Sequence, residues 1–432
     1  MSEEKNKLPR RHFLKLLGGS AAVTTATLAG CDNLSVKRGG AALTALPQGA
    51  MTYRTHPKTG DEVSILGYGM MRLPLRQKPN STDPSGQEVD QEAVNELVDY
   101  AISHGVNYFD TSATYVRGWS EAATGIALSR HPRNSYRVAT KFSNHSTVAW
   151  RERSEAIALY ERSKKNLQVD YIDYYLLHAC GVGSAVHYTE QDVDQQFDTL
   201  DKLVLKERFF DNGMLDYFIE ERKAGRIKNL GWSFHGKVEV FDFMLALQDS
   251  GYVDWDFVQI QLNYVDWKYA SGWNVNADYL YGELAKRNIP AVIMEPLLGG
   301  RLATQVNYLG ARLKQRRPHD SIASWAFRYA GSYPGVLTVL SGMTYMEHLQ
   351  DNIRTFAPLE PLTEEEFELL ADTAKRMMEY DTIPCTACEY CMPCPYGIDI
   401  PKIFTHYNRC INEGNYHKAA RVRDLVQHAV PS

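Results

Sequence analysis

The sequence predicts an α/β fold, a closed (β/α)8 TIM barrel followed by a small helical domain. Between residues 51 and 360, short apolar runs alternate with amphipathic helical stretches, and this order favours a parallel sheet. Eight such pairs close most economically as a barrel. A doubly wound open sheet is the alternative, but no glycine-rich fingerprint follows the first strand ahead of a helix. The apolar content of 44% suits one large globular unit.

Residues 1–31 are predicted to be an export signal that is not part of the fold. Arg10 and Arg11 stand in a twin-arginine pattern, and a short apolar stretch then leads to Leu28-Ala29-Gly30-Cys31, which resembles a bacterial lipoprotein box. This implies a lipid anchor on Cys31 and a place at the cell envelope, periplasmic or on the outer face. A buried helix or a membrane span is the alternative, although the stretch is short for a span. Residues 32–50 are then a linker.

The elements of the barrel follow in order. A hairpin at residues 51–72 leads into the first barrel strand and could close the barrel floor. Further strands are predicted at residues 105–110, 136–141, 171–178, 230–234, 257–262, 291–295 and 335–340. Helices are predicted at residues 92–104, 120–130, 151–167, 214–224, 238–248, 277–287, 321–329 and 346–356.

One long polar interruption, at residues 181–211, follows the fourth strand. Loops that follow barrel strands lie on the face that carries the chemistry. The segment is therefore predicted to be a substrate lid or a spacer that contains a helix.

Polar side chains at the ends of neighbouring strands mark a candidate active site. The strand at 105–110 ends at Asp110, Tyr115 follows five positions later, and the next two strands end at Lys141 and His178. Because the carboxyl ends of barrel strands meet at one mouth, we expect these four side chains to lie close together. Taken singly, each has an ordinary structural explanation: a capping Asp, a Tyr on the rim, a surface Lys and a hydrogen-bonded core His.

Asp, Tyr, Lys and His at successive strand ends resemble the catalytic tetrad of the aldo-keto reductases, and the resemblance runs from about Thr52 to Phe356. It implies that Tyr115 acts as general acid when hydride delivery turns a carbonyl into an alkoxide, and as base in reverse. A phenol with an ordinary pKa of ~10 needs a nearby cation, which Lys141 would supply. Asp110 would hold Lys141, and His178 would polarise the carbonyl.

The resemblance also implies a nicotinamide cofactor, NADP or NAD. Ser233 and Gln259 match positions that hold the carboxamide, but Phe234 stands where the family commonly has Asn. The loops after the seventh and eighth strands would hold the pyrophosphate and adenosine through Pro296, Leu297, Gly299, Arg301, Ser341, Gly342, Met343, His348, Asp351 and Asn352. Gly342 and His348 replace the Lys and Arg that many relatives use for the adenosine 2'-phosphate, so NADP and NAD both stay open.

A second motif lies in the predicted C-terminal domain, residues 361–432. Four cysteines follow one another at two-residue gaps ahead of a Pro: Cys385, Cys388, Cys391 and Cys394. They resemble the iron-sulfur loop of bacterial ferredoxins and imply a 4Fe-4S cluster, with zinc or disulfides as alternatives. Helices are predicted on either side, at residues 363–380 and 416–430. Cys410 is expected to be a buried apolar thiol, and Cys180 stands alone.

Charge and motifs together define the function hypotheses. The formal charge of -5 and the lack of a basic patch argue against a nucleic-acid partner. The first hypothesis is an oxidoreductase that acts on a small-molecule carbonyl or alcohol, such as a sugar or glycoside. The alternative is an iron-sulfur electron-transfer or regulatory protein on the same scaffold, served by a redox partner. A regulatory protein would be expected to have a broken tetrad, and this sequence retains all four residue types.

Overall fold

The computed structural model describes residues 50–79, 86–144, 152–181, 191, 193–272, 274–305, 307–387, 391–392 and 394–421. The chain divides into two compact units, residues 1–46 and 47–432, and every described residue belongs to the second. The predicted export signal, with Arg10, Arg11 and Cys31, lies outside the described residues. Across the described ranges, no helix has the length and apolar character needed to cross a membrane.

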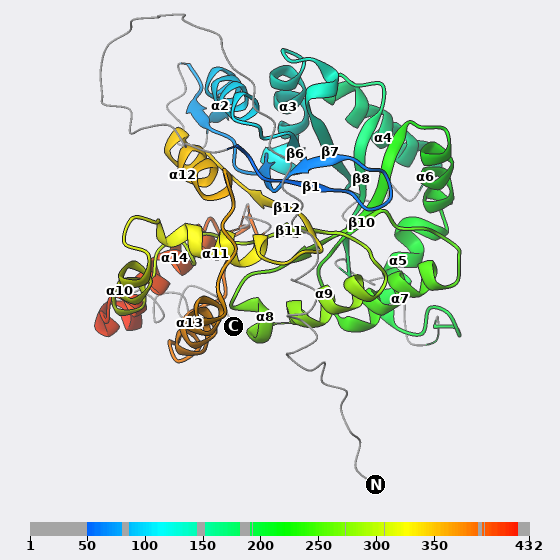
Figure 1. Ribbon diagram of the computed structural model, residues 1–432. Helices are drawn as coiled ribbons and strands as arrows, with labels where there is room; N and C mark the ends of the chain where they lie inside the picture. The colour runs from blue at the N-terminus through cyan, green and yellow to red at the C-terminus, as the bar shows by residue number, and fades with distance from the viewer. Residues whose placement is uncertain are drawn as a thin grey trace, which may run out of the picture. The chain divides into compact units, whose positions relative to one another are not determined.

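Eight parallel strands close into a barrel. They are β3 (Leu66–Gly69), β6 (Tyr108–Asp110), β7 (Arg137–Phe142), β8 (Ile172–Cys180), β9 (Ile227–Phe234), β10 (Phe257–Gln261), β11 (Ala291–Met294) and β12 (Val336–Ser341). Around the barrel their order is β10-β11-β12-β3-β6-β7-β8-β9 (Figure 1). The predicted (β/α)8 barrel is therefore confirmed, and the doubly wound alternative is wrong.

The helices expected around the barrel are all present. They are α2 (Gln91–Ser103), α3 (Ser120–Leu128), α4 (Arg153–Leu167), α6 (Met214–Lys223), α7 (Val238–Asp249), α9 (Ala277–Lys286), α11 (Ile322–Gly331) and α12 (Met346–Phe356). Each begins and ends within two residues of its predicted bounds. Helical periodicity predicts such elements where a helix buries one apolar stripe, as α2 does with Val94, Leu97, Val98 and Ala101.

Aromatic and aliphatic side chains fill the barrel interior. Tyr174 contacts Tyr108 and Phe257 edge to face, with ring centroids 5.0 and 5.1 Å apart. These rings belong to a buried cluster that also includes Val292 from β11. The interior below the mouth is thus a packed core and not a channel, so chemistry is confined to the strand ends.

The predicted hairpin closes the amino end of the barrel. Strands β1 (Tyr53–Thr55) and β2 (Glu62–Ser64) pair antiparallel. In the turn region, His56 Nε2 lies 2.9 Å from the main-chain oxygen of Asp256, just before β10. Arg137, which begins β7, donates to the carboxylate of Asp61 at 3.1 Å. The hairpin therefore lies across the strand starts, which leaves the opposite end as the open mouth.

Several elements were not predicted. They are β4 (Leu75–Gln77), β5 (Gln87–Val89), α5 (Leu200–Leu205), the π-helical turn η5 (Lys206–Phe210), α8 (Asp266–Tyr269), α10 (Asn307–Arg316) and α14 (Ile400–Asn412). Helix α5 and the turn η5 lie in the later part of the predicted insertion, residues 181–211. This part therefore contains a helix, as the spacer alternative expected. The predicted helix at 363–380 appears as α13 (Glu364–Met377). The predicted helix at 416–430 is described only as far as residue 421, and these residues are helical.

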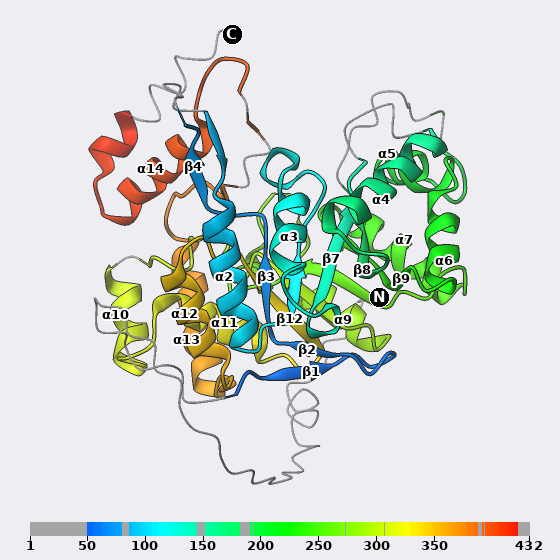
Figure 2. The same cartoon turned by 90° about the horizontal axis from the view of Figure 1, so that it is seen from above.

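Helix α13 packs on the barrel's outer helices. It lies beside α10 and α11 in both views (Figures 1 and 2), and Arg312 of α10 pairs with Asp372 of α13 at 2.6 Å. Thr363 caps α13, and Glu366 completes a capping box with it. The C-terminal region is therefore joined to the barrel by specific contacts.

Two helix glycines allow a matched test of barrel packing. A Cβ at Gly125 of α3 would lie 2.2 Å from the main-chain oxygen of Asn166, whereas a Cβ at Gly282 of α9 would meet nothing within 4 Å. Gly125→Ala should therefore lower the free energy of unfolding by about 1–3 kcal/mol. Gly282→Ala should raise it by about 0.5–1 kcal/mol, since Ala is the better helix former. Urea unfolding measures both, and equal effects would contradict the packing described.

Candidate active site

Alternation along the strands directs the predicted catalytic side chains into the barrel. On β6, β7 and β8 the interior residues Tyr108, Ala139 and Leu176 are followed two positions later by Asp110, Lys141 and His178. Neighbouring registers pair Asp110 with Ala139 and Lys141 with Leu176. All three residues are buried. They therefore converge inside the mouth of the barrel.

Lys141, Asp110 and Tyr115 form the centre of this group. Lys141 Nζ donates to Asp110 Oδ1 at 2.6 Å and to the main-chain oxygen of Thr111 at 2.7 Å. The same Nζ lies 4.8 Å from the centroid of the Tyr115 ring. The carboxylate and the carbonyl thus fix a buried ammonium next to the phenol.

The ring of His178 also lies next to the ring of Tyr115. The two ring centroids are 6.0 Å apart, at an interplanar angle of 82°. His178 Nδ1 lies 2.6 Å from Ser143 Oγ, and Ser143 Oγ lies 2.8 Å from Ser112 Oγ. When Ser143 donates to Nδ1, the ring proton of a neutral His178 is on Nε2, where it can be donated to a ligand.

The backbone after Tyr115 is strained. Val116 and Arg117 have φ angles of 50° and 55°, in the left-handed region that β-branched and long side chains avoid. Such residues cost about 1–3 kcal/mol each and persist only where the surrounding structure determines the conformation. The turn η1 (Tyr115–Gly118) therefore holds Tyr115 in one imposed position.

Burial and charge set the proton affinities in this group. Burial raises the pKa of Asp110, and Lys141 opposes the rise by its charge and hydrogen bond. Burial also raises the pKa of Tyr115 well above its usual value; Asp110 and Glu295 add to the rise, and Arg72 is the cation that lowers it. Sequence reasoning did not single out Arg72 or Glu295 as part of the site.

Glu295 is a partly buried acid at the end of β11, with a φ of 53°. Burial raises its pKa from 4.5 to about 7, opposed by the Gly299 N–H and by Arg72. The folded protein therefore keeps a proton that the unfolded chain releases above pH 4.5, and this contribution to stability is lost as the pH rises to 7.

Glu295→Gln should accordingly flatten the pH dependence of the free energy of unfolding between pH 4.5 and 7. The variant should also be more stable than the parent at the upper end of this window, because it has no carboxylate to ionise. Urea unfolding at several pH values tests this. Parallel curves for parent and variant would contradict the raised pKa.

The residues expected at the carboxamide are buried at the same mouth. Gln259 Oε1 has no hydrogen-bond partner within the part of the chain that the structure describes. Ser233 Oγ accepts from the N–H of Ala179 at 2.7 Å, which leaves its own proton to donate. A primary amide offers both a donor and an acceptor, so these two side chains fit a carboxamide.

The loops after β11 and β12 carry the residues expected at the pyrophosphate and adenosine. Gly299 has a φ of 66°, and its N–H donates to Glu295 Oε2 at 2.6 Å. Met343 is buried, and its carbonyl accepts from the hydroxyl of Tyr68 at 2.5 Å. Asn352 is also buried and donates to Ser341 Oγ at 3.0 Å. Its amide nitrogen therefore fastens α12 to the end of β12.

The other residues named for these loops differ in exposure. Gly342 and His348 are exposed, and Asp351 is partly buried. Arg301 donates to Thr382 Oγ1 at 2.9 Å. Pro296 is buried and Leu297 partly buried. Among these residues, Gly342 and His348 are thus the ones most exposed to solvent.

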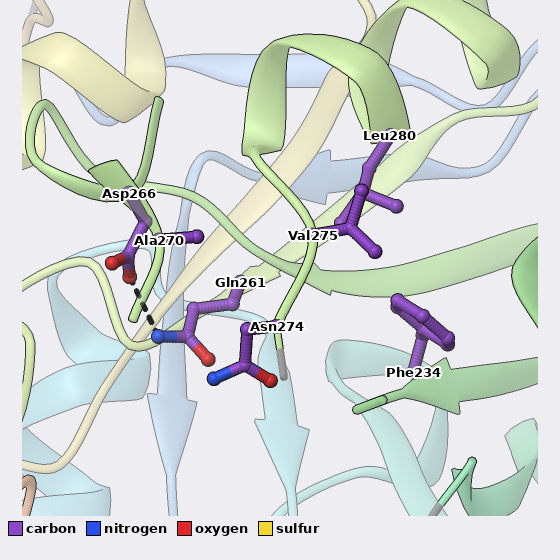
Figure 3. Close-up of a pocket in the computed structure, with 7 residues that line it drawn as sticks. All are labelled: Phe234, Gln261, Asp266, Ala270, Asn274, Val275 and Leu280. Atoms are coloured by element: carbon purple, nitrogen blue, oxygen red, sulfur yellow. Dashed lines mark hydrogen bonds between the residues drawn. The ribbon is translucent and has the colours of Figure 1, made fainter. Parts of the chain in front are cut away.

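A small side pocket opens at the ends of β9 and β10 (Figure 3). It is lined by Phe234, Gln261, Asp266, Ala270, Asn274, Val275 and Leu280. Gln261 donates to Asp266 Oδ2 at 2.6 Å, which is the dashed contact in the figure. Phe234 faces this pocket with an apolar ring. The four tetrad residues are not among its lining residues.

The cysteines are described only in part. Cys388 lies outside the described residues, and no group of three or more metal-ligating side chains is found among those described. Cys385 Sγ accepts from the N–H of Ala387 at 3.4 Å. Cys410 is buried in an apolar cluster on α14. Cys180 is buried on β8, and burial raises its pKa to about 12, so it is an unreactive thiol.

A closed parallel barrel with a buried Lys–Asp pair, a Tyr and a His at its mouth defines an enzyme of the (β/α)8 class. The model of the aldo/keto reductase family matches residues 65–375. This chain therefore belongs to the aldo/keto reductase family.

Known relatives agree with this assignment. Probable aldo-keto reductase 1 of Glycine max is 33% identical over 124 residues, which cover 28% of this chain and 34% of that relative. The uncharacterized oxidoreductase YqkF of Bacillus subtilis is 25% identical over 294 residues, which cover 65% of this chain and 87% of the relative. In fold, the chain is similar to the Bombyx mori aldo-keto reductase AKR2E4 in complex with NADP, with a TM-score of 0.52 and 19% identity over 75% of this chain and 93% of that chain.

Proposed function

We propose that the protein is an NAD(P)-dependent oxidoreductase that interconverts a carbonyl and an alcohol, with Tyr115 as general acid and base. The observation that carries this proposal is the buried Lys141–Asp110 pair beside the Tyr115 ring. An ion pair is costly to bury, and one that adjoins a phenol at a barrel mouth is suited to proton transfer. The retained tetrad favours an enzyme over the electron-transfer or regulatory alternative.

Each side chain has one task in the proposed reaction. During reduction, His178 donates to the carbonyl oxygen, and Tyr115 gives its proton to the developing alkoxide. Lys141 stabilises the phenolate that remains, and Asp110 keeps Lys141 in place. During oxidation, the phenolate accepts the alcohol proton. The nicotinamide, when bound, supplies or accepts the hydride.

Residues at the mouth fit the cofactor. Gln259 would accept from the carboxamide and Ser233 would donate to it, since Gln259 Oε1 is buried without a partner among the described residues. The loops after β11 and β12 would hold the pyrophosphate through backbone N–H groups. The substrate is a small carbonyl or alcohol, sugars and glycosides included.

The experiment is a paired binding and turnover assay on the full-length protein. NADPH and NADH are titrated separately by fluorescence, and a panel of aldehydes, ketones, aldoses and alcohols is then offered with the tighter binder. Saturable binding and consumption of the nicotinamide with at least one compound are expected. Tight binding with no turnover of any compound would instead favour a binding or regulatory protein.

The four cysteines Cys385, Cys388, Cys391 and Cys394 are proposed to hold a 4Fe-4S cluster. Their spacing supports this, as does the N–H donated to Cys385 Sγ, because cluster sulfurs commonly accept such bonds. Anaerobically purified protein should contain four iron and four sulfide per chain. Cys394→Ser should lower both, whereas Cys410→Ser should leave them unchanged. Stoichiometric zinc without iron would contradict the cluster.

The protein is further proposed to leave the cytoplasm by the twin-arginine route and to be anchored by lipid on Cys31. The support is the sequence alone: Arg10, Arg11 and the lipoprotein box. That route carries folded proteins, which is compatible with a protein loaded with cofactors before export. Membrane fractionation of the parent and of Cys31→Ala tests the anchor, and an unchanged distribution would contradict it.

A further inference from the structure

Three hydroxyl side chains form a chain that ends at the ring of His178. Ser143 Oγ lies 2.6 Å from His178 Nδ1. Ser112 Oγ lies 2.8 Å from Ser143 Oγ and 3.4 Å from the same ring nitrogen. Thr114 Oγ1 lies 3.2 Å from Ser112 Oγ. Both serines are fully buried, and a buried hydroxyl without a partner is costly, so the two hydroxyls pair with their neighbours in this chain.

The direction of the chain follows from its donors. The N–H of Thr114 can only donate, and Ser112 Oγ accepts from it at 3.3 Å. The acceptor closest to the hydroxyl of Ser112 is Ser143 Oγ, at 2.8 Å. The proton of Ser143 then has two acceptors within reach, His178 Nδ1 at 2.6 Å and the main-chain oxygen of Lys141 at 3.3 Å. The shorter contact favours the ring, and 2.6 Å is short for a ring N–H donor, whose N···O distances are about 2.7–3.2 Å.

The main chain around His178 is also held. Arg208, which is buried, donates to the carbonyl of His178 and, at 3.0 Å, to that of Ala179. The N–H of Ala179 donates to Ser233 Oγ at 2.7 Å. Because the main chain is fixed on both sides of this peptide, the hydrogen bonds of the ring itself decide which of its nitrogens carries the proton.

We propose that Ser143 and Ser112 are positioning residues that hold His178 as the neutral tautomer with its proton on Nε2. This deepens the proposed function and rests on it, since His178 donates to a carbonyl oxygen only from the nitrogen that carries the proton. The main-chain oxygen of Ser112 also accepts from the N–H of Tyr115 at 3.1 Å. Ser112 therefore holds the main chain of the proposed acid and, through Ser143, the ring that polarises the carbonyl.

Nitrogen NMR of the full-length protein, with labelled histidine and no added substrate, tests this proposal. Spectra are recorded at about pH 8, where an ordinary histidine is neutral. His178→Asn identifies the signals of this ring among those of the 13 histidines. In the parent, Nε2 should be protonated and Nδ1 unprotonated. A proton on Nδ1, or on both nitrogens, would overturn the proposal.

Ser143→Ala removes the hydroxyl that donates to Nδ1. The ratio of the Nε2–H to the Nδ1–H tautomer should fall by about fivefold, the effect of losing one net hydrogen bond. The two nitrogen shifts of the ring should therefore move toward each other. Ser143→Cys, whose thiol is a weaker donor, should lie between Ser143→Ala and the parent. Ser324→Ala is the matched control, since it removes a buried hydroxyl of α11 that donates to the main-chain oxygen of Ser321 at 2.8 Å, and it should leave the ratio unchanged.

Ser112→Ala tests the second serine. It removes the donor to Ser143, so the tautomer ratio should fall, by less than in Ser143→Ala. In both variants the other histidine signals should stay in place, because the change is confined to one ring. A ratio equal to that of the parent in either serine variant would overturn the proposal. Because the tautomer is measured without turnover, this failure is distinct from failure of the proposed reaction.

Discussion

Tyr115→Phe is expected to lower turnover by about 10²–10⁴-fold, the range typical for loss of a general acid. The hydroxyl is the proposed proton donor to the alkoxide, and the ring that packs beside Lys141 and His178 is retained. Nicotinamide affinity should stay within about twofold of the parent, because only the transition state needs the proton. Steady-state kinetics with the best compound of the panel, together with fluorescence titration, measure both quantities.

Tyr279→Phe is the matched control. It removes the same hydroxyl from a surface tyrosine of α9, which donates to Asp242 at 2.8 Å. This variant should keep the parent's rate. A Tyr115→Phe protein as fast as Tyr279→Phe would contradict the proposed role of Tyr115.

Lys141→Met should have the largest effect on stability, lowering the free energy of unfolding by about 3–5 kcal/mol. It leaves the carboxylate of Asp110, whose side chain is 4% exposed, without the ammonium that lies 2.6 Å away. Turnover should also be lost, since the phenolate loses its adjacent cation. Urea unfolding at neutral pH gives the stability difference.

Two further variants test whether the stability loss in Lys141→Met comes from a buried ion pair. The double variant Asp110→Asn with Lys141→Met should recover much of the lost stability, because no unpaired charge stays buried. Lys223→Met removes one partner of the exposed pair with Glu220, whose side chains are 66% and 67% exposed, and should change stability by less than about 1 kcal/mol. If Lys141→Met resembles Lys223→Met, the buried pair is not formed in the protein.

The barrel was predictable because burial imposes a period on the sequence. Helix α12 matches its predicted bounds since its apolar residues recur at helical spacing, with Leu349, Ile353 and Phe356 buried. Two of the missed elements lack such a pattern or are short. Strand β4 has three exposed residues, and α8 is four residues long. Helix α14 was missed although Asp399 caps it and a Pro lies in its first turn, which are recognised start signals.

The part of the candidate site that lies at the carboxyl ends of the barrel strands could be predicted from the sequence. Asp110 is the last residue of β6, Lys141 and His178 lie just before the ends of β7 and β8, and the parallel barrel brings the three together. Glu295 directly follows β11, so the same rule applied to all eight strands would have found it, whereas Arg72 lies further along the loop after β3. The contact of residues 382–387 with Arg72 could not be predicted, because it joins segments 314 and 315 residues apart with no pattern that links them.

Hydride transfer at this barrel mouth can be tested most directly with reduced nicotinamide in which both hydrogens at C4 are deuterium. In a single turnover with the best carbonyl of the panel, the account predicts that deuterium appears on the former carbonyl carbon of the alcohol. The same experiment with Tyr115→Phe should give the same labelled product at a much lower rate. Product formed without deuterium at that carbon, or formed equally fast by Tyr115→Phe, would contradict the account.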